Sequence, residues 1–342
     1  MAGLSLREEL AEIFGVLQIH SYAAFSYRGG EAIPVIANNP QGLAHQAGHE
    51  PLLEAIRNLL YGQCYVRDTG AESIQDPRPG QNLLPLLAQA NPTVDRWDPS
   101  WIIYQIASDG RIQAQKGERS RSALIGEYAS DKAPGIPLKV GDKVNLRVHP
   151  GSADLQTSFY FVFGDTLSDQ FDEYSLLRFY FNVTAAGAPD LLREIALRCN
   201  RFQVPFRFKT LVDKAAYRRA DGAVLYCAKR YFAIVASLLD SLPDAVTTQL
   251  RSSTPMFTKA LQAGIGMAEE PGSGESFGMH RCRLVAEGII DAWTTGSQTT
   301  EARLEAVEKR FAAGGFQLAR PYLNGGSIDL FEKPIFKGGI AL

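Results

Sequence analysis

The sequence predicts an α+β fold, in which a helical N-terminal part is followed by a small antiparallel β unit and by a C-terminal half that mixes helices and strands. Three observations support this prediction. Apolar residues recur at helical spacing in the first hundred positions, short runs rich in aromatic and β-branched residues occupy the middle of the chain, and strand-like and helix-like segments then alternate. We therefore divide the 342 residues into three regions, 1–98, 99–175 and 176–342.

The N-terminal region is predicted to be mainly helical. In residues 4–17 leucine and isoleucine recur at helical spacing with acidic residues between them, and residues 50–62 show a similar amphipathic pattern. A shorter helix is expected over residues 83–90, and a polar, glycine-rich stretch separates the first two helices.

The middle region is predicted to form the small antiparallel β unit. Its three expected strands are residues 101–107, 143–149 and 158–164. Residues 111–128 are rich in turn-forming residues and are expected to connect the first two strands. The segment 163–175 contains four acidic residues and no basic one, which is typical of a surface loop.

The C-terminal region is predicted to begin with the order β-α-β-β-α. The expected strands are residues 176–183, 205–212 and 222–228. Pro189 is expected in the first turn of a helix that runs to about residue 200, because proline is tolerated where a helix has no need of its N–H group. Further helices are expected over residues 229–242, 276–294 and 300–313.

Composition and missing motifs exclude several classes of function. The net charge of −2 argues against a dedicated nucleic-acid or membrane-surface protein, and no apolar run approaches the length of a membrane span. The four cysteines form no C-x-x-C pair and have no histidine at ligand spacing, so we expect neither a disulfide scaffold nor a metal site. The acidic N-terminus does not resemble a signal peptide, which favours the cytoplasm. The sequence motifs of nucleotide hydrolases, Rossmann dehydrogenases, α/β-hydrolases and zincins are absent.

A local excess of positive charge is the main functional signal. Residues 192–231 contain ten basic and three acidic side chains. Because strand side chains alternate between faces, Arg207 and Lys209 are expected on one face of their strand, opposite the phenylalanines. By the same alternation Arg178, Tyr180 and Asn182 share a face of the strand at 176–183.

If these two strands are neighbours, their polar side chains lie on a common face of the sheet. Such a face has two interpretations, an ordinary solvent-exposed surface or an anion pocket. Arginine has a planar fork suited to phosphate, and the amine of Lys209 beside several guanidinium groups would lose its proton more easily and could act as a general base.

A second cluster of polar residues lies early in the helix expected over 276–294. It contains His280, Arg281 and Arg283. His280 is either a partly exposed structural residue or a proton donor. The motif R-P-Y-L-N at 320–324 is expected to form a structural turn.

Several of these segments together resemble the HopA effector family. The matching stretches read LLRFYFN, VPFRFKTLVDKAAYRRADGAVLY, PMFTKAL, GIGMAEEP, ESFGMHRCRLVAEGIIDAW and RPYLN. They cover residues 170–325, and the N-terminal helix and W-D-P-S-W (97–101) fit the family more loosely. The founding member of the family is a type III secretion effector of a bacterium.

The resemblance implies two different functions. Some members are similar to lyases of class V lanthipeptide and thioamitide pathways, which act after a separate kinase has phosphorylated serine or threonine in a precursor peptide. The lyase eliminates phosphate to give dehydroalanine or dehydrobutyrine, and it requires no metal or organic cofactor. The founding effector instead implies a non-catalytic module that binds other proteins. On the lyase interpretation, the N-terminal region is expected to dock the peptide or the kinase.

The resemblance also implies roles for individual residues. Lys209 is placed like the base lysine of phosphothreonine lyases. The residues expected to bind phosphate or substrate are Arg178, Asn182, Arg207, Arg218 and Arg219, with Arg281 or Arg283 closing the pocket. Phosphothreonine lyases carry a histidine as the acid where this sequence reads R-F-Y-F-N. The proton donor is therefore expected to be Tyr180, Tyr217, His280 or water.

Overall fold

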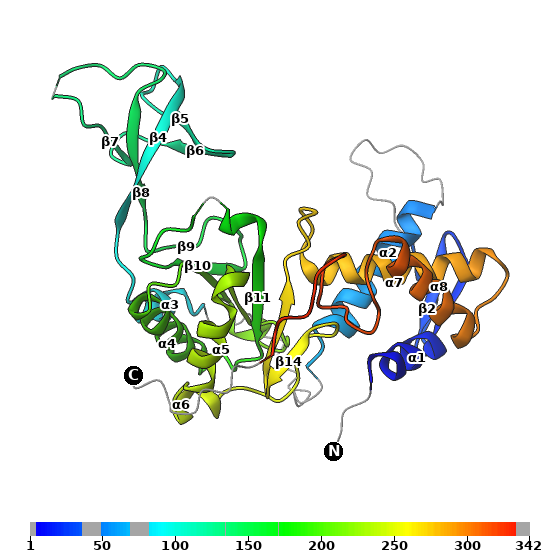
Figure 1. Cartoon of the computed structure of the whole chain (residues 1–342). Coiled ribbons are helices and arrows are strands. Elements are labelled where there is room, and N and C mark those ends of the chain that lie inside the picture. The colour runs from blue at the N-terminus through cyan, green and yellow to red at the C-terminus, as the bar shows by residue number, and fades with distance from the viewer. Residues whose placement is uncertain (1–4, 36–48, 69–81, 134, 170, 333–342) are drawn as a thin grey trace.

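The chain has an α+β fold, and the computed structural model describes residues 5–35, 49–68, 82–133, 135–169 and 171–332. A central antiparallel sheet lies between two groups of helices, and a second, smaller sheet projects from the body (Figure 1). No helix within these ranges combines the length and the apolar character that a membrane span requires.

The central sheet has seven strands in the order β14-β15-β11-β13-β12-β10-β9. They are β9 (Gly151–Ser152), β10 (Phe159–Phe163), β11 (Leu176–Phe181), β12 (Arg207–Leu211), β13 (Ala223–Ala228), β14 (Lys259–Gln262) and β15 (Ile265–Glu269). The three strands expected in the C-terminal region are present. The arrangement in which β11 and β12 are direct neighbours is not found, because β13 lies between them and pairs with both. The strands β14 and β15 were not predicted.

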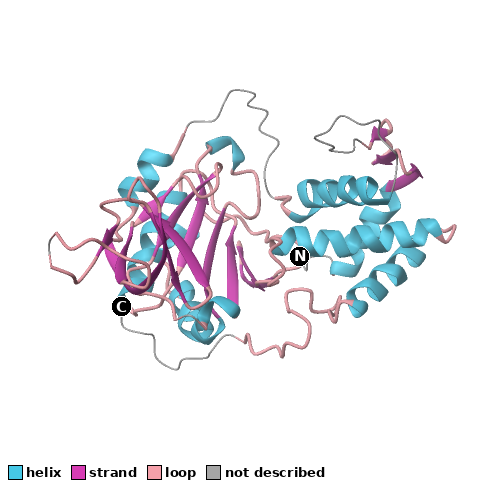
Figure 2. Cartoon of the chain, turned by 90° about the horizontal axis from the view of Figure 1, so that it is seen from above, coloured by secondary structure: helices cyan, strands magenta, loops and turns pink. Residues whose placement is uncertain are grey.

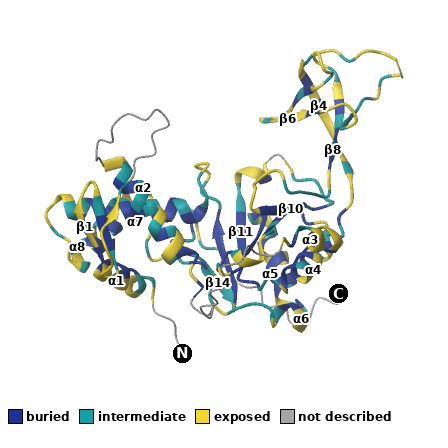
Figure 3. Cartoon of the chain, turned by 180° about the vertical axis from the view of Figure 1, so that it is seen from behind, coloured by how far each residue is buried: buried dark blue, intermediate teal, exposed yellow. Residues whose placement is uncertain are grey.

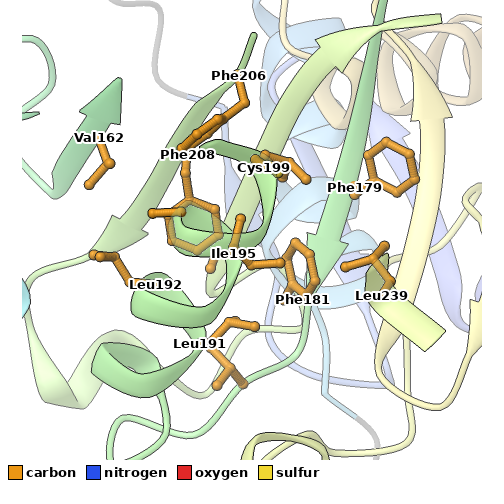
Figure 4. Close-up of a cluster of buried hydrophobic side chains, with 14 of the residues drawn as sticks. Val162, Phe179, Phe181, Leu191, Leu192, Ile195, Cys199, Phe206, Phe208 and Leu239 are labelled. Atoms are coloured by element: carbon orange, nitrogen blue, oxygen red, sulfur yellow. The ribbon is translucent and has the colours of Figure 1, made fainter. Parts of the chain in front are cut away.

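One face of this sheet carries the larger hydrophobic core. It is covered by α3 (Leu84–Ala90), α4 (Ala188–Arg201), α5 (Phe232–Asp240) and α6 (Asp244–Thr247), which are labelled in Figure 1. Figure 2 shows helices packed around the sheet in a view from above. Pro189 lies in the first turn of α4 as expected. Phe179, Phe181 and Phe208 point from the strands toward Leu191 and Ile195 of α4 (Figure 4), so the alternate residues of β11 and β12 are left to the opposite face.

The opposite face is partly covered by a group of helices that we call the helical lobe. The lobe consists of α1 (Leu6–Val16), α2 (His49–Leu60), α7 (Phe277–Thr294) and α8 (Thr300–Ala313), with the short strands β1 (Leu17–Ser21), β2 (Ala24–Tyr27) and β3 (Ile33–Pro34) at its end. N-terminal and C-terminal helices thus pack together, α1 against α8 and α2 against α7. Gly288 allows the close approach of α7 and α8, because a Cβ atom there would lie 2.6 Å from the Cα of Val307. Ser5 begins α1 with a capping box to Glu8.

The smaller sheet has the strand order β6-β5-β4-β8-β7 and stands away from the body (Figures 1 and 3). It comprises β4 (Arg96–Ile106), β5 (Ile112–Lys116), β6 (Arg119–Ala123), β7 (Tyr128–Ala129) and β8 (Lys143–Val148). Its own small core contains Trp101, Ile103 and Leu146.

Three expectations for the middle region need correction. The strand at 158–164 does not join the small sheet but pairs with β12 in the central one, where its residues are buried on both faces. Much of the turn-rich segment 111–128 forms β5 and β6, which pair through a tight turn at Gly117. The acidic segment 163–175 is not wholly a surface loop, since Asp172 is buried and accepts a hydrogen bond from Arg230 at 2.8 Å.

Candidate functional site

Three cations gather around the ring of Tyr226 on the half-open face of the central sheet. Arg178 on β11 and Arg207 on β12 both lie opposite Tyr226 in the strand register. Their Cζ atoms are 5.2 and 4.6 Å from the centre of the Tyr226 ring, and the Nζ atom of Lys209 is 5.9 Å from it. The strand between the two basic strands therefore supplies the aromatic surface on which their cations are held. We call Arg178, Arg207, Lys209 and Tyr226 the cationic face.

Lys209 lies half-buried between aromatic rings and other cations. Its Nζ atom is 4.3 Å from the centre of the Phe159 ring and donates a hydrogen bond to Gln156 Oε1 at 3.2 Å. Burial, together with the charges of Arg178, Arg207 and Arg219, lowers the pKa of Lys209 to about 8, although Asp221 acts in the opposite direction. A substantial fraction of this amine is therefore neutral slightly above neutral pH, and a neutral amine can accept a proton.

The two arginines of the cationic face differ in how far their charge is compensated. Arg178 is buried and forms a bidentate ion pair with Glu270, with Nη2 2.5 Å from Oε1. Arg207 is half-buried and has no ion-pair partner within the described part of the chain, and its buried Nε atom has no hydrogen-bond partner there. Arg207 thus has donors available for an anionic ligand. The donors of Arg178 are already bound to Glu270, so an anionic ligand would compete with that carboxylate for them.

A second set of polar groups lies beside Lys209 and joins the sheet to the helical lobe. Arg219 donates two hydrogen bonds of 2.8 Å to Asp221, and its Nη2 atom also donates to Tyr61 Oη at 3.0 Å. Tyr61 belongs to a π turn, Tyr61–Tyr65, that extends α2. Burial and the charge of Asp221 raise the pKa of Tyr61 to about 12.

Sequence reasoning singled out Arg219 but missed Tyr61, its partner, and Tyr226, the ring at the centre of the cationic face. Tyr61 is separated from Arg219 by more than 150 residues, so no local pattern connects them. Tyr226 was detectable, because strand alternation places it on the face of the predicted strand opposite Leu225 and Cys227, which belong to the larger core.

Tyr217 and Tyr180, two of the expected proton donors, are buried and almost inaccessible to solvent. Tyr217 is buried on the α4 side of the sheet, where its hydroxyl donates to the Leu211 carbonyl at 2.6 Å and lies 2.8 Å from Thr210 Oγ1. Tyr180 is on the same face as Arg178 but is only 2% exposed, beneath Tyr65 of the helical lobe. Burial raises the pKa of both tyrosines.

The cluster at the start of α7 is engaged in structural contacts. Arg281 is fully buried and donates to the carbonyls of Pro321 and Leu323 at 2.7 and 2.8 Å, so it holds the R-P-Y-L-N segment as a turn. The Nδ1 atom of His280 is 2.7 Å from Arg281 Nη1, and burial with this neighbouring charge lowers the pKa of His280 to about 4. Arg283 pairs with Glu275 and Glu287 on the helix surface.

The remaining two candidates are placed differently from each other. Asn182 is fully buried and donates to Ser253, at 3.0 Å to the carbonyl and 2.8 Å to the hydroxyl, so its amide is already used. Arg218 is exposed, next to Arg219 in the sequence. The structure thus brings Arg178, Arg207, Lys209 and Arg219 together and leaves the α7 cluster outside this group.

A separate cavity of about 1250 Å³ lies between α1 and the loop over residues 252–258. Its lining includes Arg28, Arg67 and Cys64 but none of the residues of the cationic face. Among the residues that the structure describes, no three histidine, cysteine or acidic side chains are grouped as metal ligands. The cationic face is therefore the group with the clearest chemistry.

Comparisons with known proteins found one family and similar solved structures. A protein-family model described as the HopA1 effector protein family matches residues 151–323. Two solved effector structures are similar, one from Pseudomonas syringae pv. tomato strain DC3000 (22% identity, TM-score 0.38) and one from Pseudomonas syringae pv. syringae strain 61 (16% identity, TM-score 0.36). Each similarity covers 49% of this chain and 63% of the solved chain, which is less than two thirds of either effector. No curated protein matches the sequence.

Proposed function

The chain belongs to the HopA1 effector protein family, whose model matches about half of its length, and from this membership and the cationic face we propose that it is a phosphoserine/phosphothreonine lyase. The reaction is β-elimination of phosphate from a phosphorylated precursor peptide, which leaves dehydroalanine or dehydrobutyrine. The observation that carries the proposal is a half-buried lysine, with a pKa lowered to about 8, among three arginines.

Phosphate recognition is assigned to the arginines. The unpartnered donors of Arg207 suit phosphate oxygens, and Arg219 presents a guanidinium group fixed in place by Asp221. Arg178 adds a guanidinium group on the same face of the sheet, with its orientation set and its charge partly compensated by Glu270. These fixed charges compensate the negative charge that develops on the leaving phosphate.

Proton abstraction is assigned to Lys209. Its neutral amine takes the proton from the Cα atom of the phosphorylated residue, the electrons of that C–H bond form the Cα–Cβ double bond, and the Cβ–O bond to phosphate breaks. The protonated lysine then returns its proton to solvent. These reaction steps use only side chains of the protein itself.

The substrate and its source follow from the same chemistry. A phosphorylated peptide requires a separate serine/threonine kinase, and we place both steps in a reducing cytoplasm, in keeping with the four unpaired cysteines.

Family membership is equally compatible with a module that binds a phosphorylated protein and does no chemistry.

The experiment that separates these functions uses a synthetic phosphoserine peptide, analysed by mass spectrometry. The lyase proposal predicts loss of one phosphoric acid with the wild-type protein and no loss with Lys209→Ala, while Lys214→Ala, an exposed lysine on the neighbouring turn, behaves as wild type. A phosphopeptide that binds the wild-type protein but remains intact would instead support the binding module.

A further inference from the structure

We propose that Tyr61 donates the proton that the leaving phosphate takes up, so that the helical lobe supplies a catalytic residue; this inference rests on the proposed lyase function. Tyr61 lies outside residues 151–323, the segment matched by the family model. The reacting group would therefore be assembled from both parts of the chain.

The hydrogen bonding of Tyr61 leaves its proton available. Tyr61 Oη accepts a hydrogen bond from Arg219 Nη2 at 3.0 Å, so the hydroxyl proton points elsewhere. No acceptor within the described ranges takes that proton. The ring is held by stacking on Tyr65, with the ring centres 5.3 Å apart, and Arg219 is itself fixed by Asp221. A phenol held in this way is a positioned donor with an open direction.

The other donors that the sequence suggested do not offer a proton to a ligand. The hydroxyl of Tyr217 is committed to the Leu211 carbonyl, and that of Tyr180 is buried beneath Tyr65. His280 is neutral above a pKa of about 4 and lies against Arg281 on α7. Tyr61 is half-buried, and it is connected through Arg219 to the same charges that act on Lys209.

Backbone contacts between the helical lobe and the sheet domain keep Tyr61 near the sheet. Arg67 and Arg219 form an isolated β bridge, and the Ala220 amide donates to the Val66 carbonyl at 2.9 Å. These backbone contacts join the end of the π turn to the segment that carries Arg219. The position of the phenol is thus set by main-chain pairing as well as by its own hydrogen bond.

The proton balance of the step is as follows. Lys209 takes the Cα proton, the Cβ–O bond breaks, and the Tyr61 hydroxyl proton passes to the oxygen of the leaving phosphate. The phenolate that remains is stabilised by the guanidinium group of Arg219. Tyr61 then regains a proton from water, and Lys209 releases one, which restores the starting state.

Tyr61→Phe tests this role because it removes only the hydroxyl. The matched control is Tyr27→Phe in the same lobe, whose hydroxyl lies 3.6 Å from Cys64 Sγ. Elimination is measured under single turnover with a phosphoserine peptide, and binding of the same peptide is measured in a Lys209→Met background, where no turnover occurs. Thermal unfolding confirms that each variant is folded.

We expect Tyr61→Phe to slow elimination by about 100-fold or more, to leave the peptide Kd within about twofold, and Tyr27→Phe to change neither. An unchanged elimination rate would overturn the role of Tyr61 in catalysis. A loss confined to Kd would also overturn it, because Tyr61 would then only position Arg219. If the wild-type protein eliminates no phosphate, the proposed function itself fails, and the wild-type measurement alone shows this.

Discussion

Replacing Lys209 by methionine should make the protein more stable near neutral pH. The structure holds the Lys209 amine half-buried among other cations, and its pKa falls from 10.5 to about 8. A shift of this size corresponds to about 3 kcal/mol of unfavourable free energy in the charged folded state. Methionine removes the charge and places an apolar group next to the rings of Phe159 and Phe161, whose centres lie 4.3 and 5.8 Å from Lys209 Nζ.

The effect has a defined dependence on pH. Because the pKa of Lys209 is lower in the folded than in the unfolded state, the folded protein loses this proton first as pH rises. The unfavourable free energy of the charged Lys209 amine is fully present below a pH of about 8, and it disappears as pH approaches 10.5. The stability advantage of Lys209→Met should therefore be largest near neutral pH and shrink across this range.

Urea unfolding of the wild type and Lys209→Met, near pH 7 and near pH 10, measures this difference. Lys214→Met is the control, since an exposed lysine should change the free energy of unfolding by less than about 0.5 kcal/mol. The reasoning is that burial and the neighbouring cations disfavour the charged amine of Lys209 in the folded state. Equal free energies of unfolding for the wild type and Lys209→Met near pH 7, or a stability advantage of Lys209→Met that grows with pH, would refute it.

Three further variants test other parts of the structure. Arg281→Met should lower the free energy of unfolding by about 2–4 kcal/mol, because the carbonyls of Pro321 and Leu323 lose their donor; an unchanged urea midpoint would contradict this. Tyr217→Phe should cost about 1 kcal/mol and leave elimination at the wild-type rate, so a large loss of activity in a mass-spectrometric assay would show that Tyr217 acts in the reaction. Glu270→Gln removes the carboxylate that neutralises Arg178 and should tighten phosphopeptide binding by up to about tenfold; weaker binding in a titration would show that Glu270 mainly orients Arg178.

Local periodicity was sufficient to predict much of the fold and part of the site. The alternation of large apolar and basic residues along 205–212 and 176–183 correctly indicated that Arg207, Lys209 and Arg178 face away from the phenylalanines. The helices α1, α2, α4, α7 and α8 have apolar stripes at helical spacing, and all of them are present.

The features that were missed depend on contacts distant in the sequence. The aromatic run of β10 is compatible with either sheet, and only pairing with β12 decides between them. The hairpin of β14 and β15 contains Gly264 and Gly266, which weaken its strand pattern; Gly266 is needed because a Cβ atom there would lie 2.5 Å from Thr258 Oγ1. The contact between Tyr61 and Arg219 exists only after the helical lobe has packed on the sheet.

The pH dependence of phosphate elimination tests most directly whether Lys209 is the base. The account predicts that kcat/KM for a phosphoserine peptide rises between about pH 6.5 and 9.5 with a midpoint near the Lys209 pKa of about 8, and that Lys209→Met shows no elimination at any pH. A wild-type protein that leaves the phosphopeptide intact throughout this range, or a Lys209→Met protein with the same rising profile, would contradict it.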